Sequence, residues 1–519
     1  MAGQTGAFGR VLLPALAGIL VIGSALGGCT SAGVGKASDH TTSVSVPDAV
    51  GRAPTGHSTS GWSPQSVPAP LPTPSAPNLA PPLSNPRMVP SETSVSFPDP
   101  GPDSQAIRDQ HDADFAIVLK MLSGTLMAGN KAKFLIPFAA PLTHRVGHWF
   151  ANTRTLGVAA TVFARADDFS SGATDSADSF TRTVVPAVRT PFDDSDSMAG
   201  IPYAVGVSVA TKGARRALTI TGWQPKYLDD PMNCDCTLSV VRSAATAVVA
   251  NASDRDLTFW CGAALRAADS GIAWSHAQLA GSPLVIPHGQ VIFLADRPFR
   301  WFLSSSGPEQ KSNVTAGLVS ALGDYPGTVY SDQSRIVLML RSLDGTVVPN
   351  DGRGRQYAQD VLTHESTHQL MNRNSTLPGR SDNSPPSWVV EGIAVAVETL
   401  HRDALANPEE SGYPEPNDPK NIDRDWLGEH LTDQMPTNEQ LYSLARSDSS
   451  GYYAIAGSVF RYIAREYGYP AMLAVAKAMY AKPAQNPFAY FPDQENPGSL
   501  LPAATAKSRW RAWFVNAYE

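Results

Sequence analysis

Residues 360–371 read DVLTHESTHQLM and place two histidines four positions apart among apolar residues at helical spacing. Residues four apart share one face of an α-helix, so His364 and His368 would present both imidazoles to the same point. Two imidazoles in that arrangement suit Zn²⁺. Glu365 lies beside the first histidine and could accept a proton from a water on the metal, because zinc lowers the pKa of such a water to about 7.

A third ligand is required, since a catalytic zinc takes three protein ligands and keeps one position open. In the HExxHxxGxxH type, a glycine and a histidine follow the motif. The corresponding positions here are Met371 and Asn374, which excludes that type. The next candidate is Glu391, 23 positions after His368 in the segment WVVEGIAVAVE of residues 388–398.

The sequence before Glu391 has the features of a helix start. It reads SPPS and ends in Ser387, a natural N-cap, so a helix is expected over residues 388–401. An acidic residue among small and apolar neighbours needs a partner, and zinc would be one. The alternative is a glutamate that merely favours the N-terminus of a helix.

The order HExxH followed by WxxEGxA resembles the gluzincin metallopeptidases, the peptidase MA-like clan with thermolysin-like folds. The pattern is similar to that of bacterial peptidase MA-like families related to the aminopeptidase N group. The resemblance covers residues 356–519. It implies one Zn²⁺ held by His364, His368 and Glu391, with Glu365 as the general base, and a peptide or protein substrate. No GxMEN sequence precedes the motif, which disfavours an aminopeptidase of the aminopeptidase N type.

These families often continue with a tyrosine-rich helix, and residues 452–468, YYAIAGSVFRYIAREYG, look like it. By this resemblance Tyr453 would donate a hydrogen bond to the oxyanion of the tetrahedral intermediate. Tyr452 and His401 are alternatives for the same role. Each of the three could equally be an ordinary core or surface side chain.

The sequence departs from the family at the residue that orients a ligand histidine. Several gluzincins place an acidic residue four positions after the third ligand, and that position here is Val395. Metal-bound histidines normally need such an outer partner. Asp360, four before the motif, and Glu398, seven after Glu391, could supply it, or could be solvated helix charges.

The N-terminus has the layout of a secretory signal over residues 1–28. Arg10 precedes an apolar run that is too short to span a bilayer comfortably, and the run ends in LGGC. This ending resembles the bacterial lipobox, in which the cysteine, here Cys29, is lipidated and anchors the protein to the membrane outside the cytoplasm. The alternative is an ordinary signal peptide with an incidental cysteine. Residues 29–103 are rich in proline and serine and predict a disordered, extended tether.

Residues 104–245 are expected to form an α+β domain. Apolar spacing predicts helices over residues 112–127 and 141–156, followed by β-like runs. Two helices before a curved antiparallel sheet resemble the cone of the nuclear transport factor 2-like fold, and the alternative is an unspecified α+β domain. The β-like runs are residues 158–165, 201–210 and 217–221.

Residues 246–519 are expected to form the metallopeptidase domain, β-rich over 246–345 and helical over 346–519. Strands are predicted at residues 257–260, 285–295 and 334–340, with a helix at 314–322. Glutamate, a good helix former, is concentrated in the last part: two lie before residue 365 and eleven from there on.

Three cysteines remain after Cys29. In an exported protein an internal disulfide with one thiol left over is plausible among Cys234, Cys236 and Cys261, and the sequence leaves open which residue pairs with Cys261. A metal at these cysteines is disfavoured, because no histidine lies near enough in sequence to complete a four-ligand site.

The composition limits the classes of protein to which the chain could belong. The 519 residues are 42% hydrophobic, enough for a packed core, and the net charge of −7 argues against a nucleic-acid binder. The expectation is a multidomain α+β protein acting as a membrane-anchored, extracytoplasmic zinc peptidase. The alternatives are a catalytically inactive, peptidase-like binding module at the cell envelope and a structural lipoprotein. A structural zinc site would usually be closed by four protein ligands.

Overall fold

The fold was taken from a computed structural model of the chain. The predicted signal segment, Cys29 and almost all of the predicted tether lie outside the described residues. No helix among the described residues is long and apolar enough to cross a membrane. The structure describes residues 96–98, 104–166, 175–193, 198–212, 215–226, 230–279, 284–295, 317–321, 323–325, 334–340, 347–374, 385–405, 424–431, 434–441, 446–482, 486–496 and 498–518.

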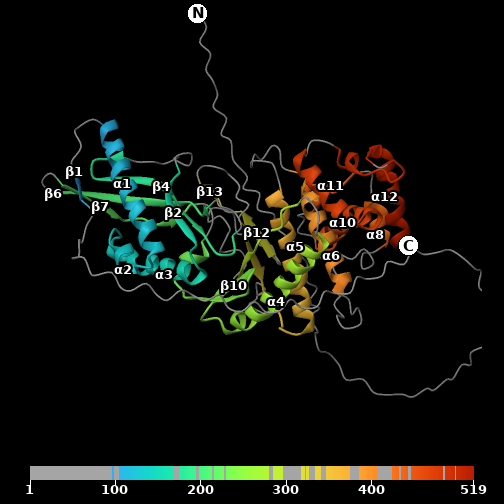
Figure 1. Cartoon of the computed structure of the whole chain (residues 1–519), viewed down its shortest axis with the longest axis horizontal. Helices are drawn as coiled ribbons and strands as arrows, with labels where there is room; N and C mark the ends of the chain where they lie inside the picture. The colour runs from blue at the N-terminus through green and yellow to red at the C-terminus, as the bar shows by residue number, and fades with distance from the viewer. Residues whose placement is uncertain are drawn as a thin grey trace, which may run out of the picture. The chain divides into compact units, whose positions relative to one another are not determined.

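The first part of the compact body packs helices against an antiparallel sheet (Figure 1). The helices α1 (Ser104–Met127) and α3 (Ala140–Leu156) confirm the two predicted ones, and α2 (Lys131–Leu135) lies between them. The sheet runs β1-β7-β6-β4-β5-β13, with β2 and β3 also paired to β4 and β8 to β6. Its strands are β1 (Ser96–Pro98), β2 (Ala160–Arg165), β3 (Asp175–Ser176), β4 (Ser179–Arg189), β5 (Met198–Gly200), β6 (Tyr203–Lys212), β7 (Arg215–Ile220), β8 (Gln224–Pro225) and β13 (Gly323–Tyr325).

Three strands of this sheet, β2, β6 and β7, confirm the predicted β-like runs, whereas the longest strand, β4, was not predicted. The strand β1 lies within the predicted tether and pairs with β7, with Ser96 opposite Ala217. Backbone pairing therefore extends this sheet upstream of the expected start of order.

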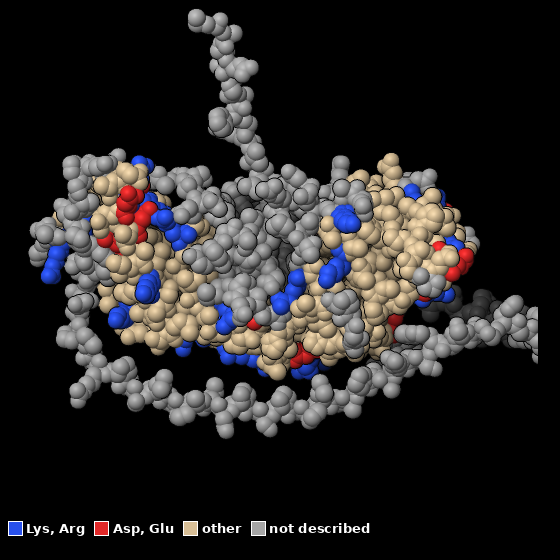
Figure 2. Space-filling model, turned by 45° about the horizontal axis from the view of Figure 1, so that its top comes forward, with Lys and Arg blue, Asp and Glu red and all other residues tan. Residues whose placement is uncertain are grey.

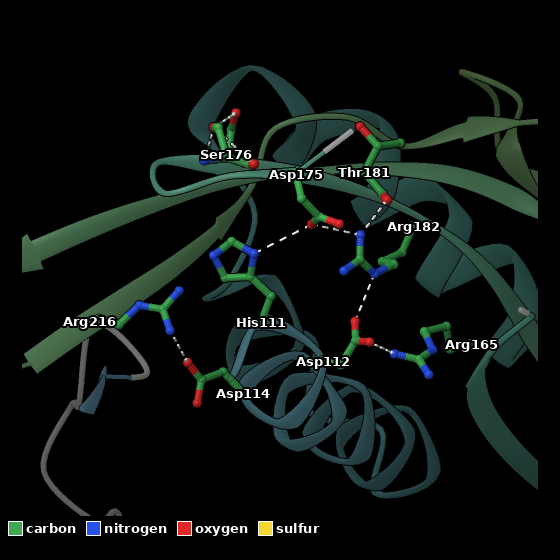
Figure 3. Close-up of polar contacts among 10 residues, drawn as sticks. His111, Asp112, Asp114, Arg165, Asp175, Ser176, Thr181, Arg182 and Arg216 are labelled. Atoms are coloured by element: carbon green, nitrogen blue, oxygen red, sulfur yellow. Dashed lines mark hydrogen bonds and ion pairs between the residues drawn. The ribbon is translucent and has the colours of Figure 1, made fainter. Parts of the chain in front are cut away.

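A charged network that is partly buried joins α1 to the sheet (Figure 3). Arg216 of β7 pairs with Asp114 at 3.0 Å, and both side chains are buried. Arg182 of β4 contacts Asp112 at 2.7 Å and Asp175 at 3.0 Å. Buried charges need partners of opposite sign, so these pairs help to hold the first turns of α1 against the strands.

A second sheet runs β12-β14-β11-β10-β9, with β10, β11 and β14 parallel and the outer strands antiparallel. Its strands are β9 (Leu238–Arg242), β10 (Thr246–Asn251), β11 (Gln290–Ala295), β12 (Gly317–Ala321) and β14 (Ser334–Met339). Successive side chains of a strand point to opposite faces. One face packs into the core of the first part through Val249, Phe293 and Val337. The other face packs through Val248, Ile292 and Ile336 into the core of the helical part, the region that was predicted to be helical over residues 346–519. Both faces of this sheet are therefore buried.

This sheet crosses the predicted domain boundary. Residue 245 ends the turn after β9 and residue 246 begins β10, and the two strands pair antiparallel with Ala247 opposite Arg242. The described residues on both sides of this boundary accordingly belong to one compact unit.

Two secondary-structure predictions in this region are wrong. Residues 257–260 belong to α4 (Arg255–Gln278), because the side chain of Asp254 caps the helix by accepting from the backbone N–H groups of Asp256 and Leu257. Residues 317–321 of the predicted helix 314–322 form β12, which pairs with the buried strand β14. In the first case a helix cap outweighed a local composition that favours a strand. In the second case strand pairing outweighed a local composition that favours a helix.

The disulfide joins Cys234 and Cys236, so Cys261 is the thiol left over. The expectation that Cys261 takes part in a disulfide is therefore wrong. Cys261 lies in α4, where its thiol donates to the backbone oxygen of Leu257 at 3.5 Å. Burial raises the pKa of Cys261 to about 11, which makes it a poor nucleophile.

A buried ion pair joins the two sheets. Arg335 of β14 donates to both carboxylate oxygens of Asp193, beyond the end of β4, at 2.6 and 3.0 Å. Asp193 also accepts from the backbone N–H and the hydroxyl of Thr190. Burial raises the pKa of Asp193, but Arg335 outweighs burial and holds this pKa below its usual value.

The remaining α-helices of the described residues follow the second sheet in the sequence. They are α5 (Gly352–Asn374), α6 (Ser387–Leu405), α8 (Arg424–His430), α9 (Asn438–Leu441), α10 (Arg446–Tyr467), α11 (Tyr469–Ala481) and α12 (Ala503–Tyr518). On the face drawn in Figure 2, charged side chains of the described residues are scattered among uncharged ones. The ionisable groups of α5 and α6 described next are buried instead.

Close approach of α6 and α10 depends on glycine. A Cβ on Gly392 would lie 2.6 Å from the backbone oxygen of Ala456, and one on Gly457 would lie 2.6 Å from a methyl group of Val395. The glycine that follows Glu391 therefore has a packing role.

Candidate metal centre

The helix α5 carries the two predicted ligand histidines. At the start of α5, the carboxylate of Asp351 accepts a hydrogen bond from the backbone N–H of Gly354. The helix then packs against α4, α6 and the second sheet. His364 and His368 lie on one face of the helix with ring centroids 4.8 Å apart, and both are buried. The predicted helix and its shared face are therefore confirmed.

Glu391 on α6 completes the group. Its Oε2 atom lies 3.4 Å from Nε2 of His364 and 3.5 Å from Nε2 of His368, and the three ligand atoms all lie within 4.8 Å of one another. Tetrahedral coordination with bonds of about 2.0–2.1 Å would separate ligand atoms by about 3.3 Å. The two Glu391 contacts are near that separation and are long for ordinary hydrogen bonds.

Glu398 orients the first histidine. Its Oε2 atom lies 3.0 Å from Nδ1 of His364, while Nε2 of the same ring faces Glu391. A proton on Nδ1 donated to Glu398 leaves a lone pair on Nε2, which is how metal-bound histidines are usually held. Glu398 can reach this ring because it lies two helical turns after Glu391, on the same face. Val395, one turn after Glu391, packs against Gly457 instead.

Asp360 is linked to Glu398 through Arg402. Its carboxylate pairs with Arg402 at 2.7 Å and accepts from Gln356 at 2.7 Å, and Arg402 donates to Glu398 at 3.1 Å. Burial raises the pKa of Asp360 to about 7. Of the two acidic residues predicted to orient a histidine, Glu398 contacts the ring, and Arg402 links Asp360 to Glu398.

The buried carboxylates raise the affinity of this site for positive charge. Burial lowers the pKa of His364, but hydrogen bonds to Glu391 and Glu398 outweigh burial and raise it to about 10. Burial raises the pKa of Glu391, yet the charge of His368 and bonds to both histidines lower it to about 2. A divalent cation on the two Nε2 atoms would supply the charge that protons supply to these groups.

Glu365 is completely buried, and neither of its carboxylate oxygens has a hydrogen-bond partner among the described residues. Burial raises its pKa to about 7, although the charges of His368 and His364 oppose this. A buried acid without a partner is costly to keep, and such groups are concentrated at functional sites. The donor set of His364, His368 and Glu391 could hold a metal ion, and this buried acid lies beside it.

The predicted alternatives for an oxyanion donor lie in different surroundings. Tyr452 accepts a hydrogen bond from Gln440 at 3.1 Å, and its ring contacts Trp426 of α8. His401 lies 2.8 Å from the hydroxyl of Thr363. Burial lowers the pKa of His401 to about 4, so this ring is neutral near pH 7. Both side chains are thus engaged by groups other than the ligand set.

Tyr453 is buried in α10, which packs against α6. The contacts of Trp388 with Phe460 and of Gly392 with Ala456 show that the two helices run antiparallel. Tyr453, one turn before Ala456, is therefore level with residues about one turn beyond Gly392. Along the helix axis, Tyr453 of α10 is thus level with the part of α6 between Glu391 and Glu398.

Sequence reasoning missed Tyr480 on α11. Its phenol is buried and has no hydrogen-bond partner among the described residues. Burial and the charge of Glu391 both raise its pKa, so the hydroxyl keeps its proton and stays a donor. Tyr480 belongs to no motif, and the one indication in the sequence would have been a tyrosine in an apolar helix.

Comparison with models of known protein families gives no match, and no curated protein is significantly similar to the chain.

Proposed function

We propose that this chain is a zinc-dependent peptidase of the gluzincin type that hydrolyses peptide bonds in peptides or proteins. The observation that supports the proposal most is the convergence of His364, His368 and Glu391 beside the buried carboxylate of Glu365, which has no hydrogen-bond partner among the described residues. Two imidazoles, one carboxylate and a free acid are the components of a metal-assisted hydrolase site.

Each residue has a separate task in this proposal. Bound zinc would polarise the scissile carbonyl and lower the pKa of the attacking water. Glu365 accepts the proton of that water and passes it to the leaving amine, a task suited to an acid with a pKa of about 7. Glu398 holds His364 in the tautomer that presents Nε2, and Arg402 and Asp360 hold Glu398.

The finer architecture and the location belong to the same proposal. The helical part would be the thermolysin-like catalytic body, and the helices and antiparallel sheet of the first part would be of the nuclear transport factor 2-like kind. We further propose that Cys29 carries lipid and that residues 30–95 tether the enzyme to the outer face of a cell membrane.

A zinc measurement joined to a hydrolysis assay tests the function. We expect the purified chain to hold zinc in this site and to cleave members of a mixed peptide library. Glu391→Ala should lose this zinc to a competing chelator because one of three ligands is gone. Glu495→Ala is the control, since Glu495 is exposed. Full zinc retention by Glu391→Ala would remove Glu391 from the ligand set, and zinc without any hydrolysis would favour the binding-module alternative.

The next prediction concerns which of the two buried tyrosines, Tyr453 or Tyr480, donates a hydrogen bond to the oxyanion. Donors aimed at a developing oxyanion contribute roughly 10²–10³ in turnover. We expect Tyr480→Phe to lower kcat by about that factor with zinc content unchanged, because this phenol has no hydrogen-bond partner within the described part of the chain and is close enough to sense the charge of Glu391. Tyr453→Phe tests the residue named by the resemblance.

Tyr452→Phe is the matched control for both changes, because its hydroxyl already accepts from Gln440. A large effect of Tyr453→Phe with a silent Tyr480→Phe would restore the assignment made from sequence. No loss of turnover in either variant would show that neither phenol is the donor.

A further inference from the structure

A second pair of histidines four positions apart lies on α3. His144 and His148 have ring centroids 4.8 Å apart, the same separation as His364 and His368. Nδ1 of His144 lies 3.1 Å from Oδ1 of Asp235, and Nε2 of His148 lies 3.7 Å from the same oxygen. The three ligand atoms lie within 4.8 Å of one another. We propose that these three residues form a second metal site, which binds a transition-metal dication of the zinc class.

The tautomer of one ring is already set for this role. Nδ1 of His148 lies 3.1 Å from the backbone oxygen of Cys236 and can donate its proton there. Nε2 then carries the lone pair and faces Asp235. Histidines that bind metals usually donate their other ring N–H to a carbonyl or a carboxylate in this way.

The loop that carries Asp235 is held against the same helix. Asp235 stands between Cys234 and Cys236, which the disulfide joins. Asn152, one turn after His148 on α3, donates to the backbone oxygen of Cys236 at 3.0 Å and accepts from the backbone N–H of Leu238 at 3.1 Å. These constraints hold the carboxylate near the two imidazoles before a metal arrives, which lowers the entropy cost of binding.

Exposure and ligand type define which ion the site takes. The side chains of His144 and Asp235 are 74% and 70% exposed, so water can fill the remaining coordination positions. Imidazole ligands favour zinc, nickel and copper over magnesium and calcium, which prefer oxygen. As plain ion pairs the same contacts would contribute little to the stability of the fold, because solvent screens exposed charges.

Calorimetric titration of Zn²⁺ into the metal-free, full-length chain tests the proposal. We expect His144→Ala and Asp235→Asn each to weaken one zinc-binding step by more than about tenfold, the least that loss of a ligand should cost. His276→Ala is the matched control, since His276 is an exposed histidine on another helix, α4. Calcium should give no binding step that depends on His144.

The result does not depend on the proposed peptidase site, because Glu391→Ala should leave the step that requires His144 intact. Circular dichroism is the check that each variant is folded, which we expect because both substitutions lie at exposed positions. Zinc isotherms of His144→Ala and Asp235→Asn that match the wild type would overturn the proposal.

Discussion

Glu365→Gln is expected to lower peptide hydrolysis by about 10²–10⁴-fold while the chain keeps its fold and its zinc. The amide cannot accept the proton of the attacking water, but it has nearly the same shape as the carboxylate. Zinc retention is expected because the proposed ligand atoms belong to His364, His368 and Glu391. Steady-state kinetics on a cleaved peptide and elemental analysis of the same sample give both quantities.

The stability of Glu365→Gln provides a second readout. The wild-type carboxylate is fully buried, with no hydrogen-bond partner among the described residues, so removing its charge relieves a desolvation penalty in the metal-free chain. We expect a melting temperature equal to or above that of the metal-free wild type. Glu495→Gln is the control because its carboxylate is exposed. Activity within a few-fold of the wild type would show that Glu365 is not the general base.

Asp193→Ala is expected to lower the free energy of unfolding by about 3–5 kcal/mol, the range for breaking a buried ion pair on one side. Arg335 would lose two hydrogen bonds of 2.6 and 3.0 Å and remain buried with its charge less compensated. Chemical denaturation measures the loss. In the double variant Asp193→Leu with Arg335→Met, part of the stability should return, because no buried charge is stranded.

The contribution of Asp193 should depend on pH in a definite direction. Its pKa in the folded chain is below the usual value, because Arg335 outweighs the effect of burial. The carboxylate therefore stabilises the fold above about pH 4, the pKa range of unfolded aspartate, and this stabilisation is lost as the pH falls through the lower folded value. The difference between wild type and Asp193→Ala should shrink below about pH 4. A difference that stays constant or grows on acidification would contradict the role assigned to the pair.

Much of the site could be predicted because its chemistry is local in the sequence. A spacing of four puts His364 and His368 on one helical face wherever the helix lies, and an apolar helix start singles out Glu391. The helices α1, α3, α5 and α6 have the expected positions for the same reason. Predictions were wrong where a local feature was outweighed by its surroundings: Asp254 caps a helix through residues read as a strand, and pairing with β14 makes residues 317–321 a strand.

The sequence by itself therefore determined the α+β class, the helix of the HExxH motif and the identity of the three candidate ligands. Tertiary structure decided which of Asp360 and Glu398 contacts His364, since both are acidic and only packing of α5 on α6 distinguishes them. It also brought His144 and His148 to Asp235, across about 90 residues of chain. Such encounters depend on long-range packing, and the spacing of residues along a chain carries no information about them.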